Sequence, residues 1–171
     1  ARGEVHQTLS PAMDIQVASN FERFLYYHFE QDSDRLVAFM QEFTATGSAS
    51  IGAPPNTQLM SSVAVNTEQT LAAMRDVNQQ FQYVLDPHTA VGYHAARKHL
   101  DEMSKGTDIV VVATAHPAKF PDAVQEATGF EPTHPTLEAL KGLDMHRTAL
   151  PCDIGAVKTY LVEKLQMARE A

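Results

Sequence analysis

Apolar residues recur every three or four positions in several stretches of the chain, which is typical of amphipathic helices. Four such stripes are Phe21, Phe24, Leu25 and Phe29; Leu36, Phe39, Met40 and Phe43; Leu71, Met74, Val77 and Phe81; and Gly92, Ala96, Leu100 and Met103. The small residues of the fourth stripe predict close contact with a neighbouring element. After Asp153 the pattern predicts a final helix, whose inward stripe is Ile154, Val157, Leu161 and Leu165.

Capping signals indicate where some of these helices begin and end. Ser19 and Glu22 stand at the spacing of a capping box. Gly47 occupies the position of a C-terminal cap. In the pair Asp86-Pro87, the aspartate suits an N-cap and the proline suits the first helical position. The next helix should therefore begin at this pair.

Two stretches predict β-strands. Residues 13–18 have the pattern of a short strand, and residues 108–114 form a continuous apolar run typical of a parallel strand covered on both faces. Strands separated by helices indicate an α/β fold. Because the strands are too few for a complete doubly wound sheet, we expect a helix-rich α/β chain with a partial parallel sheet.

The remaining segments complete the expected organisation. A helix is predicted from His116-Pro117 to Thr128-Gly129, and a short one over about 136–143. Residues 47–65 include a stretch rich in Ser, Gly and Pro and predict a loop. We expect residues 1–171 to form one domain or a large piece of one, with no second independent domain.

Composition and charge exclude several function classes. The 171 residues carry a formal net charge of −8 without a cluster of Lys and Arg, which argues against nucleic acid or an anionic membrane as a partner. No apolar run approaches the length of a membrane span. Cys152 is the only cysteine, which excludes an internal disulfide and fits a reducing cytoplasm. Neither His88 and His94 nor His94 and His99 have the spacing that would place both on one helix face, so no metal site is expected.

Two junctions between an extended segment and a helix are the candidate sites, at residues 85–89 and at residues 113–120. In open α/β sheets, ligands bind outside the carboxyl ends of the strands, where helix N-termini offer free backbone N–H groups. Spacing alone leaves structural alternatives open at these positions, namely an N-cap for Asp86, a strand end for Thr114, and ordinary surface side chains for His88, His116 and Lys119.

Three strings carry more specific information than spacing does. Residues 113–120 read Ala-Thr-Ala-His-Pro-Ala-Lys-Phe, residues 86–91 read Asp-Pro-His-Thr-Ala-Val, and residues 10–15 read Ser-Pro-Ala-Met-Asp-Ile. Taken in their order along the chain, from residues 10–15 to residues 113–120, they resemble strings of the threonine synthase family. The resemblance implies the fold of type II pyridoxal-phosphate enzymes. It also implies conversion of O-phospho-L-homoserine and water to L-threonine and phosphate, with pyridoxal phosphate as cofactor.

The resemblance assigns expected roles to individual residues. Thr114 matches the position at which these enzymes place a hydroxyl beside the pyridine nitrogen of the cofactor. Asp86 would bind the cofactor from the start of a helix. The wall of the same pocket would be formed by His88, Thr89, Ala115, His116 and Lys119.

One departure from the family pattern bears on activity. The family's Schiff-base lysine and the Gly-rich loop that cradles the cofactor phosphate lie upstream, and neither string occurs here. We therefore expect the chain to be the C-terminal portion of a threonine synthase, with the missing N-terminal portion as its partner, no catalytic residue of its own and no activity alone. Two alternatives are a non-catalytic binding or regulatory module derived from the family, and a small enzyme that uses His and Asp as acid and base.

Overall fold

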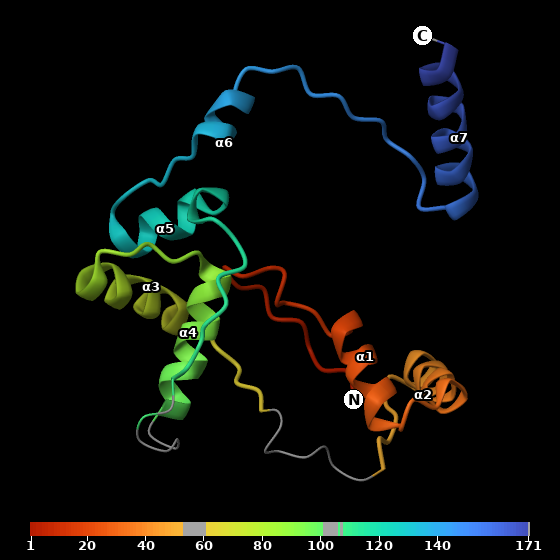
Figure 1. Cartoon of the computed structure of the whole chain (residues 1–171), viewed down its shortest axis with the longest axis horizontal. Helices are drawn as coiled ribbons and strands as arrows, with labels where there is room; N and C mark the ends of the chain where they lie inside the picture. The colour runs from red at the N-terminus through yellow and green to blue at the C-terminus, as the bar shows by residue number, and fades with distance from the viewer. Residues whose placement is uncertain (53–60, 101–105, 107, 171) are drawn as a thin grey trace. The chain divides into compact units, whose positions relative to one another are not determined.

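The computed structural model describes residues 1–52, 61–100, 106 and 108–170. These residues form helices joined by irregular segments (Figure 1). Contacts between Cα atoms divide the chain into two compact units, Ala1–His134 and Pro135–Ala171. Met103 of the predicted fourth stripe and residues 53–60 of the predicted loop lie outside the described residues.

Three helices form the core of the first unit: α3 (Thr67–Phe81), α4 (Pro87–Leu100) and α5 (Pro121–Thr128). Helix α3 packs against both α4 and α5. The buried core residues are Ala73, Met74, Val77, Leu85, Ala90, Val124 and Ala127. Met74 and Val77 face this core as predicted, whereas Phe81 is 64% exposed and its predicted inward position is wrong. Phe81 is the last residue of α3, where the chain turns away at Gln82 with a positive φ of 53°.

Gly92 of α4 lies where residues 108–115 run past the helix. A Cβ atom at this position would lie 3.5 Å from Cγ1 of Val111. That distance is ordinary van der Waals contact, so an alanine would also fit at this position. The predicted contact with a neighbouring element is confirmed at Gly92, but the space there does not require a glycine.

Helices α1 (Ser19–His28) and α2 (Ser33–Thr46) pack against each other across a short turn. Leu25 and Phe29 are buried between them. Gly47 ends α2 with a φ of 76°, which confirms the predicted cap. The capping box predicted at Ser19 is wrong, because Ser19 already lies inside α1 and the N-cap residue makes no side-chain hydrogen bond.

The predicted partial parallel sheet is not confirmed, because the described residues contain no β-strand. Residues 10–14 form a turn instead, in which the N–H of Met13 donates to the carbonyl of Ser10 at 2.8 Å. Residues 108–112 keep the alternation of a strand, with Val110 and Val112 exposed and Ile109 and Val111 half-buried, whereas Ala113 and Thr114 are both exposed. A strand needs a neighbouring backbone for its hydrogen bonds. The described part of the chain supplies none to this segment.

The helix predicted from His116 to Gly129 is divided in two. A 3₁₀ turn, η1 (Pro117–Lys119), precedes α5. Pro121 has no N–H to continue the first turn, and its fixed φ suits the first position of a new helix. Gly129 ends α5 with a φ of 74° at the predicted boundary.

The second unit contains α6 (Pro135–Leu140) and α7 (Ile154–Glu170). Asp153 caps α7 as predicted, because its side chain accepts from the N–H of Ala156 at 2.8 Å. The stripe predicted to face inward is exposed instead, at Ile154, Val157, Leu161 and Leu165. An amphipathic helix buries its apolar face only against another element. None of the helices in the described residues is long and apolar enough to cross a membrane.

We predict that the isolated chain self-associates through residues 108–114, whose backbone has no strand partner among the described residues. Val112→Lys should lower the oligomer fraction measured by light scattering after size exclusion, because a lysine on an unpaired strand disfavours pairing with another chain. Val112 is 72% exposed, so the substitution creates no buried charge.

Val37→Lys on α2 is the control, since Val37 is also an exposed valine, at 53%. It should leave the oligomer fraction unchanged. A monodisperse monomer before any substitution would contradict the prediction, as would an equal effect of both lysines.

Candidate functional site

The start of α4 is built around the carboxylate of Asp86, which is only 1% exposed. Its Oδ1 accepts from the backbone N–H groups of His88, at 2.9 Å, and Thr89, at 3.4 Å. Its Oδ2 accepts from the hydroxyl of Thr89. The predicted N-cap at Asp86 and first helical residue at Pro87 are confirmed. Free N–H groups at the helix start compensate the carboxylate for the loss of water.

His88 is 7% exposed and contacts each of the three strings singled out in the sequence. Its Nδ1 lies 3.2 Å from Oδ1 of Asp86 in its own string. Its Nε2 accepts from the N–H of Ala12, in the turn at residues 10–14, at 3.4 Å. Its ring lies against that of Phe120, with centroids 4.7 Å apart. This side chain therefore contacts a segment 76 positions before it and another that follows it in the chain.

The turn at residues 10–14 is held by a second carboxylate. Asp14 accepts from the N–H of Thr8 at 2.6 Å and from the hydroxyl of Thr8 at 2.8 Å. The hydroxyl of Thr8 also lies 3.0 Å from that of Ser10, which is 3% exposed. The sequence analysis did not single out Thr8, and it included Ser10 only as part of the string at residues 10–15. The available signal was the spacing of short polar side chains around a proline, which is typical of turns closed by side chains.

The other predicted site residues lie along residues 113–120 and are largely accessible. Thr114, His116 and Lys119 are exposed, and Ala115 is half-buried. Nδ1 of His116 accepts from the N–H of Ala118 at 3.1 Å, so the proton of the neutral ring lies on Nε2. The ring of His116 also meets that of His134 edge-on, with centroids 4.7 Å apart. Sequence reasoning missed His134, which lies 18 positions away in an irregular segment.

The two predicted junctions border one hollow of about 330 Å³. Leu85 and Thr89 line it from the first junction, and Ala113 lines it from the second. Tyr93 and Val111 add apolar walls. Thr114 follows Ala113 directly, and its hydroxyl makes no hydrogen bond that involves another described side chain or backbone group. The hollow therefore has a mainly apolar lining, and Thr114 is next to it in the chain without lining it.

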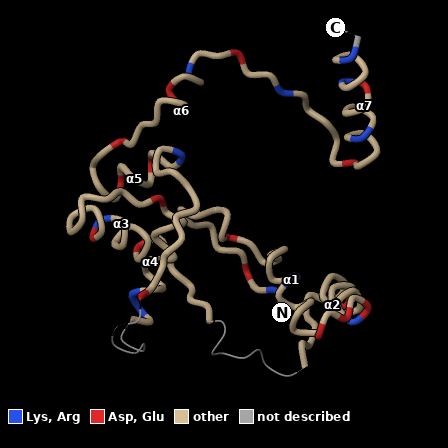
Figure 2. The backbone as a smooth tube through the Cα atoms, in the orientation of Figure 1, with Lys and Arg blue, Asp and Glu red and all other residues tan. Residues whose placement is uncertain are grey.

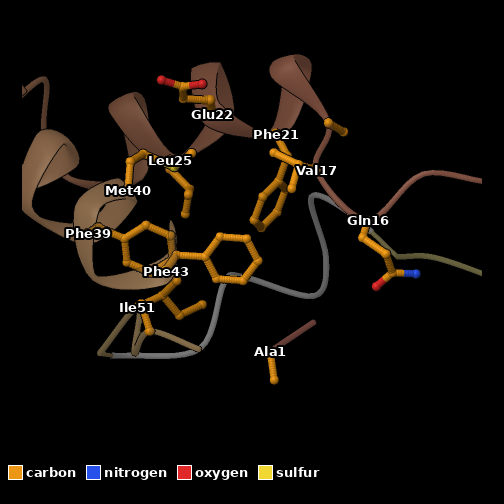
Figure 3. Close-up of a pocket in the computed structure, with 12 residues that line it drawn as sticks. Ala1, Gln16, Val17, Phe21, Glu22, Leu25, Phe39, Met40, Phe43 and Ile51 are labelled. Carbon is orange, nitrogen blue, oxygen red and sulfur yellow. The ribbon is translucent and has the colours of Figure 1, made fainter. Parts of the chain in front are cut away.

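A second pocket, of about 390 Å³, lies between α1 and α2 and has a mainly apolar lining. Figure 3 shows side chains from both helices converging on it, among them Phe21, Leu25, Phe39, Met40 and Phe43. None of the predicted site residues lines this pocket. We place the candidate site at the smaller hollow, because residues from both predicted junctions line it.

Charged residues of both signs are interspersed along the described chain (Figure 2). Within the candidate site, the acidic side chain of Asp86 is buried and the basic side chain of Lys119 is exposed. The negative group therefore serves the internal framework, whereas the positive group is accessible to a ligand.

Comparison with known proteins identifies one family. A family model described as "Threonine synthase, C-terminal" matches residues 89–161. The threonine synthase of Pseudomonas aeruginosa is 36% identical over 162 residues, which cover 92% of this chain and 34% of that protein. That of Corynebacterium glutamicum is 34% identical over 169 residues, covering 95% of this chain and 35% of that protein. The chain thus spans about a third of the length of the curated relatives it matches.

Two solved structures share the fold. The structure of pyridoxal-phosphate-bound threonine synthase from Brucella melitensis matches with a TM-score of 0.77 at 36% identity, covering 94% of this chain and 35% of that chain. The structure of yeast threonine synthase matches with a TM-score of 0.76 at 28% identity, covering 97% of this chain and 38% of that chain. The likeness therefore covers nearly the whole of the present chain.

We predict that Asp86→Ala destabilises the protein more than Asp32→Ala does. Both aspartates are N-caps, but Asp32 is exposed and accepts only from the N–H of Arg35. Loss of that exposed cap should cost about 1 kcal/mol. Loss of Asp86 also leaves buried donors of His88 and Thr89 without an acceptor, so roughly 3 kcal/mol is expected. Urea unfolding followed by circular dichroism measures both values.

Asp86→Asn tests the same interaction in a milder form. Its amide oxygen can still accept from the backbone of α4, so its free energy of unfolding should lie between those of the original chain and Asp86→Ala. Equal costs for Asp86→Ala and Asp32→Ala would show that the buried hydrogen bonds add nothing.

Proposed function

Because the sequence and fold of this chain match the C-terminal portion of the threonine synthase family, we propose that it forms the C-terminal part of a threonine synthase catalytic unit. The complete enzyme would convert O-phospho-L-homoserine and water to L-threonine and phosphate. The observation that carries the proposal is the match of 94% of this chain to a pyridoxal-phosphate-bound threonine synthase.

Pyridoxal phosphate would serve as the cofactor of the complete enzyme and supply an electron sink for proton removal. The apolar lining of the hollow and a hydroxyl on the residue that follows Ala113 fit that group in part. Its apolar lining by Leu85, Tyr93 and Val111 suits a flat aromatic ring. The hydroxyl of Thr114 has no partner among the described residues, so it is available to hydrogen-bond a ring nitrogen. A cradle for the phosphate of the cofactor would have to come from the N-terminal portion.

Asp86 belongs to the proposed cofactor site as a residue that holds its neighbours in place. Its carboxylate oxygens accept from the backbone of His88 and from the backbone and hydroxyl of Thr89. This fixes Thr89, which lines the hollow. The structure thus supports an indirect contribution of Asp86, and its direct contact with the cofactor stays a prediction.

Ala115, His116 and Lys119 would form the accessible side of the same wall. The exposed ammonium of Lys119 and the Nε2–H of His116 are both donors. Donors of this kind suit an anionic substrate such as O-phospho-L-homoserine. Their accessibility supports a role toward a ligand, because neither side chain is buried in the framework of the chain.

The N-terminal portion of the enzyme would be the macromolecular partner of this chain. The exposed valines of residues 108–114 have the alternation of a strand that lacks its neighbours. A sheet in that portion would supply both the missing hydrogen bonds and a cover for Val110 and Val112. The Schiff-base lysine would come from the same portion, so this chain alone should be inactive.

We predict that Thr114→Val impairs the complete enzyme whereas Thr114→Ser does not. Valine keeps the size and branching of threonine but removes the hydroxyl. Loss of a hydrogen bond to a charged or strongly polarised partner should lower kcat/KM by roughly 10- to 100-fold. Release of phosphate from O-phospho-L-homoserine measures the rate. Equal rates for the valine and serine variants would remove Thr114 from the cofactor site.

The isolated chain provides the control for the source of the Schiff-base lysine. Mixed with pyridoxal phosphate, it should show no absorption from a cofactor–lysine adduct and release no phosphate from the substrate. An adduct that disappears in Lys119→Ala would place the reactive lysine in this chain and contradict the proposed division of the site.

A further inference from the structure

The buried ring of His88 has a geometry that the assigned roles leave unexplained. We propose that His88 is a positioning residue that joins three segments of the site wall, and that Asp86 selects the tautomer in which it does so. The role in catalysis rests on the proposed function. The contacts themselves do not, because they are features of this chain.

The tautomer follows from the two neighbours of the ring nitrogens. The backbone N–H of Ala12 can only donate, so Nε2 of His88, 3.4 Å away, must be unprotonated to accept. The proton of the neutral ring then lies on Nδ1, which faces Oδ1 of Asp86 at 3.2 Å. Both hydrogen bonds are satisfied by this tautomer and neither by the other. Asp86 thereby keeps Nε2 available as an acceptor.

The acceptor at Nε2 holds the turn at residues 10–14. That turn is closed within itself by Asp14, which accepts twice from Thr8. Its hydrogen bond from Ala12 to His88 connects it to a helix 76 residues away in the sequence. Loss of the acceptor should therefore leave the turn intact as a local structure but free it from α4.

The face of the His88 ring positions the third segment. Phe120 packs against it with an interplanar angle of 53°. Phe120 lies between η1 and α5, because its N–H donates to Pro117 and its carbonyl accepts from Val124. The ring contact thus fixes the end of residues 113–120, the segment that carries Thr114.

A purely structural role for a buried aromatic residue predicts something different. If His88 only filled space, another ring would replace it and the two nitrogens would be irrelevant. If it positions the turn, the acceptor at Nε2 matters separately from the volume of the ring. These two roles can be distinguished by substitutions that place a polar group at the position of either Nδ1 or Nε2, but not both.

The test compares His88→Gln with His88→Asn. The glutamine amide reaches the place of Nε2, so its oxygen can accept from Ala12. The asparagine amide reaches only the place of Nδ1, so it can donate to Asp86 but leaves Ala12 without an acceptor. Hydrogen exchange of the Ala12 amide, measured by NMR in the full 171-residue chain, reports on the contact directly.

We expect the protection of Ala12 to fall roughly fivefold in His88→Asn and to be retained in His88→Gln. The amide of Met74, inside α3, is the internal reference for general loss of stability. Nitrogen-15 spectra of labelled histidine should show the proton of His88 on Nδ1. A proton on Nε2 would overturn the proposal. Equal protection of the Ala12 amide in the original chain and both variants would also overturn it. So would a fall in protection that is the same for the amides of Ala12 and Met74.

The same two variants in the complete enzyme test the role in catalysis. We expect kcat/KM to fall in His88→Asn and to be restored in His88→Gln, a rescue that loss of packing alone would not produce. Equal rates in both variants would overturn the role in the reaction. Absence of threonine synthase activity in the unsubstituted enzyme would refute the proposed function, while the exchange experiment would still decide whether His88 holds the turn.

Discussion

The arrangement of the candidate site depends on a carboxylate that is removed from water. Burial of a charged group is costly unless hydrogen bonds replace those it made to solvent. Asp86 obtains them from the start of α4, which presents backbone N–H groups that no residue within the helix can satisfy. These hydrogen bonds to Asp86 fix the first turn of α4 and with it the positions of His88 and Thr89. The position of Thr89 at the hollow and the link between α4 and the turn around Ala12 depend on that one local structure.

A difference between helices and strands explains why the helices of this chain pack into a core whereas residues 108–114 have no pairing partner among the described residues. A helix satisfies its backbone hydrogen bonds within one segment, so α3, α4 and α5 can pack into a core from this chain alone. A strand depends on another segment. Residues 108–112 accordingly keep an alternating exposure, but no described segment pairs with residues 108–114 as a neighbouring strand. This asymmetry is in keeping with our proposal that an N-terminal portion of the enzyme pairs with this segment.

The residues grouped together by resemblance fall into two physical classes. Asp86 and His88 are buried, and their side chains form hydrogen bonds with other groups of the protein. Thr114 and Lys119 are exposed and have functional groups accessible to a ligand. The three strings that resemble the family contain residues of both classes. The resemblance does not distinguish them, since a residue that holds the fold and a residue that binds a ligand can be equally specific to a family. Burial and hydrogen-bond partners separate them.

The sequence by itself determined the features that depend on neighbouring residues. Asp86-Pro87 defines the start of α4 and Gly47 the end of α2, because caps act within one turn of the chain. Only the tertiary structure decided which apolar faces are buried and which distant segments meet. The stripe of α7 has the periodicity of a buried face but is exposed, and the bond from Ala12 to His88 leaves no local signal. Burial and long-range hydrogen bonds require a second segment at the right place in space, which the spacing of residues along one segment does not specify.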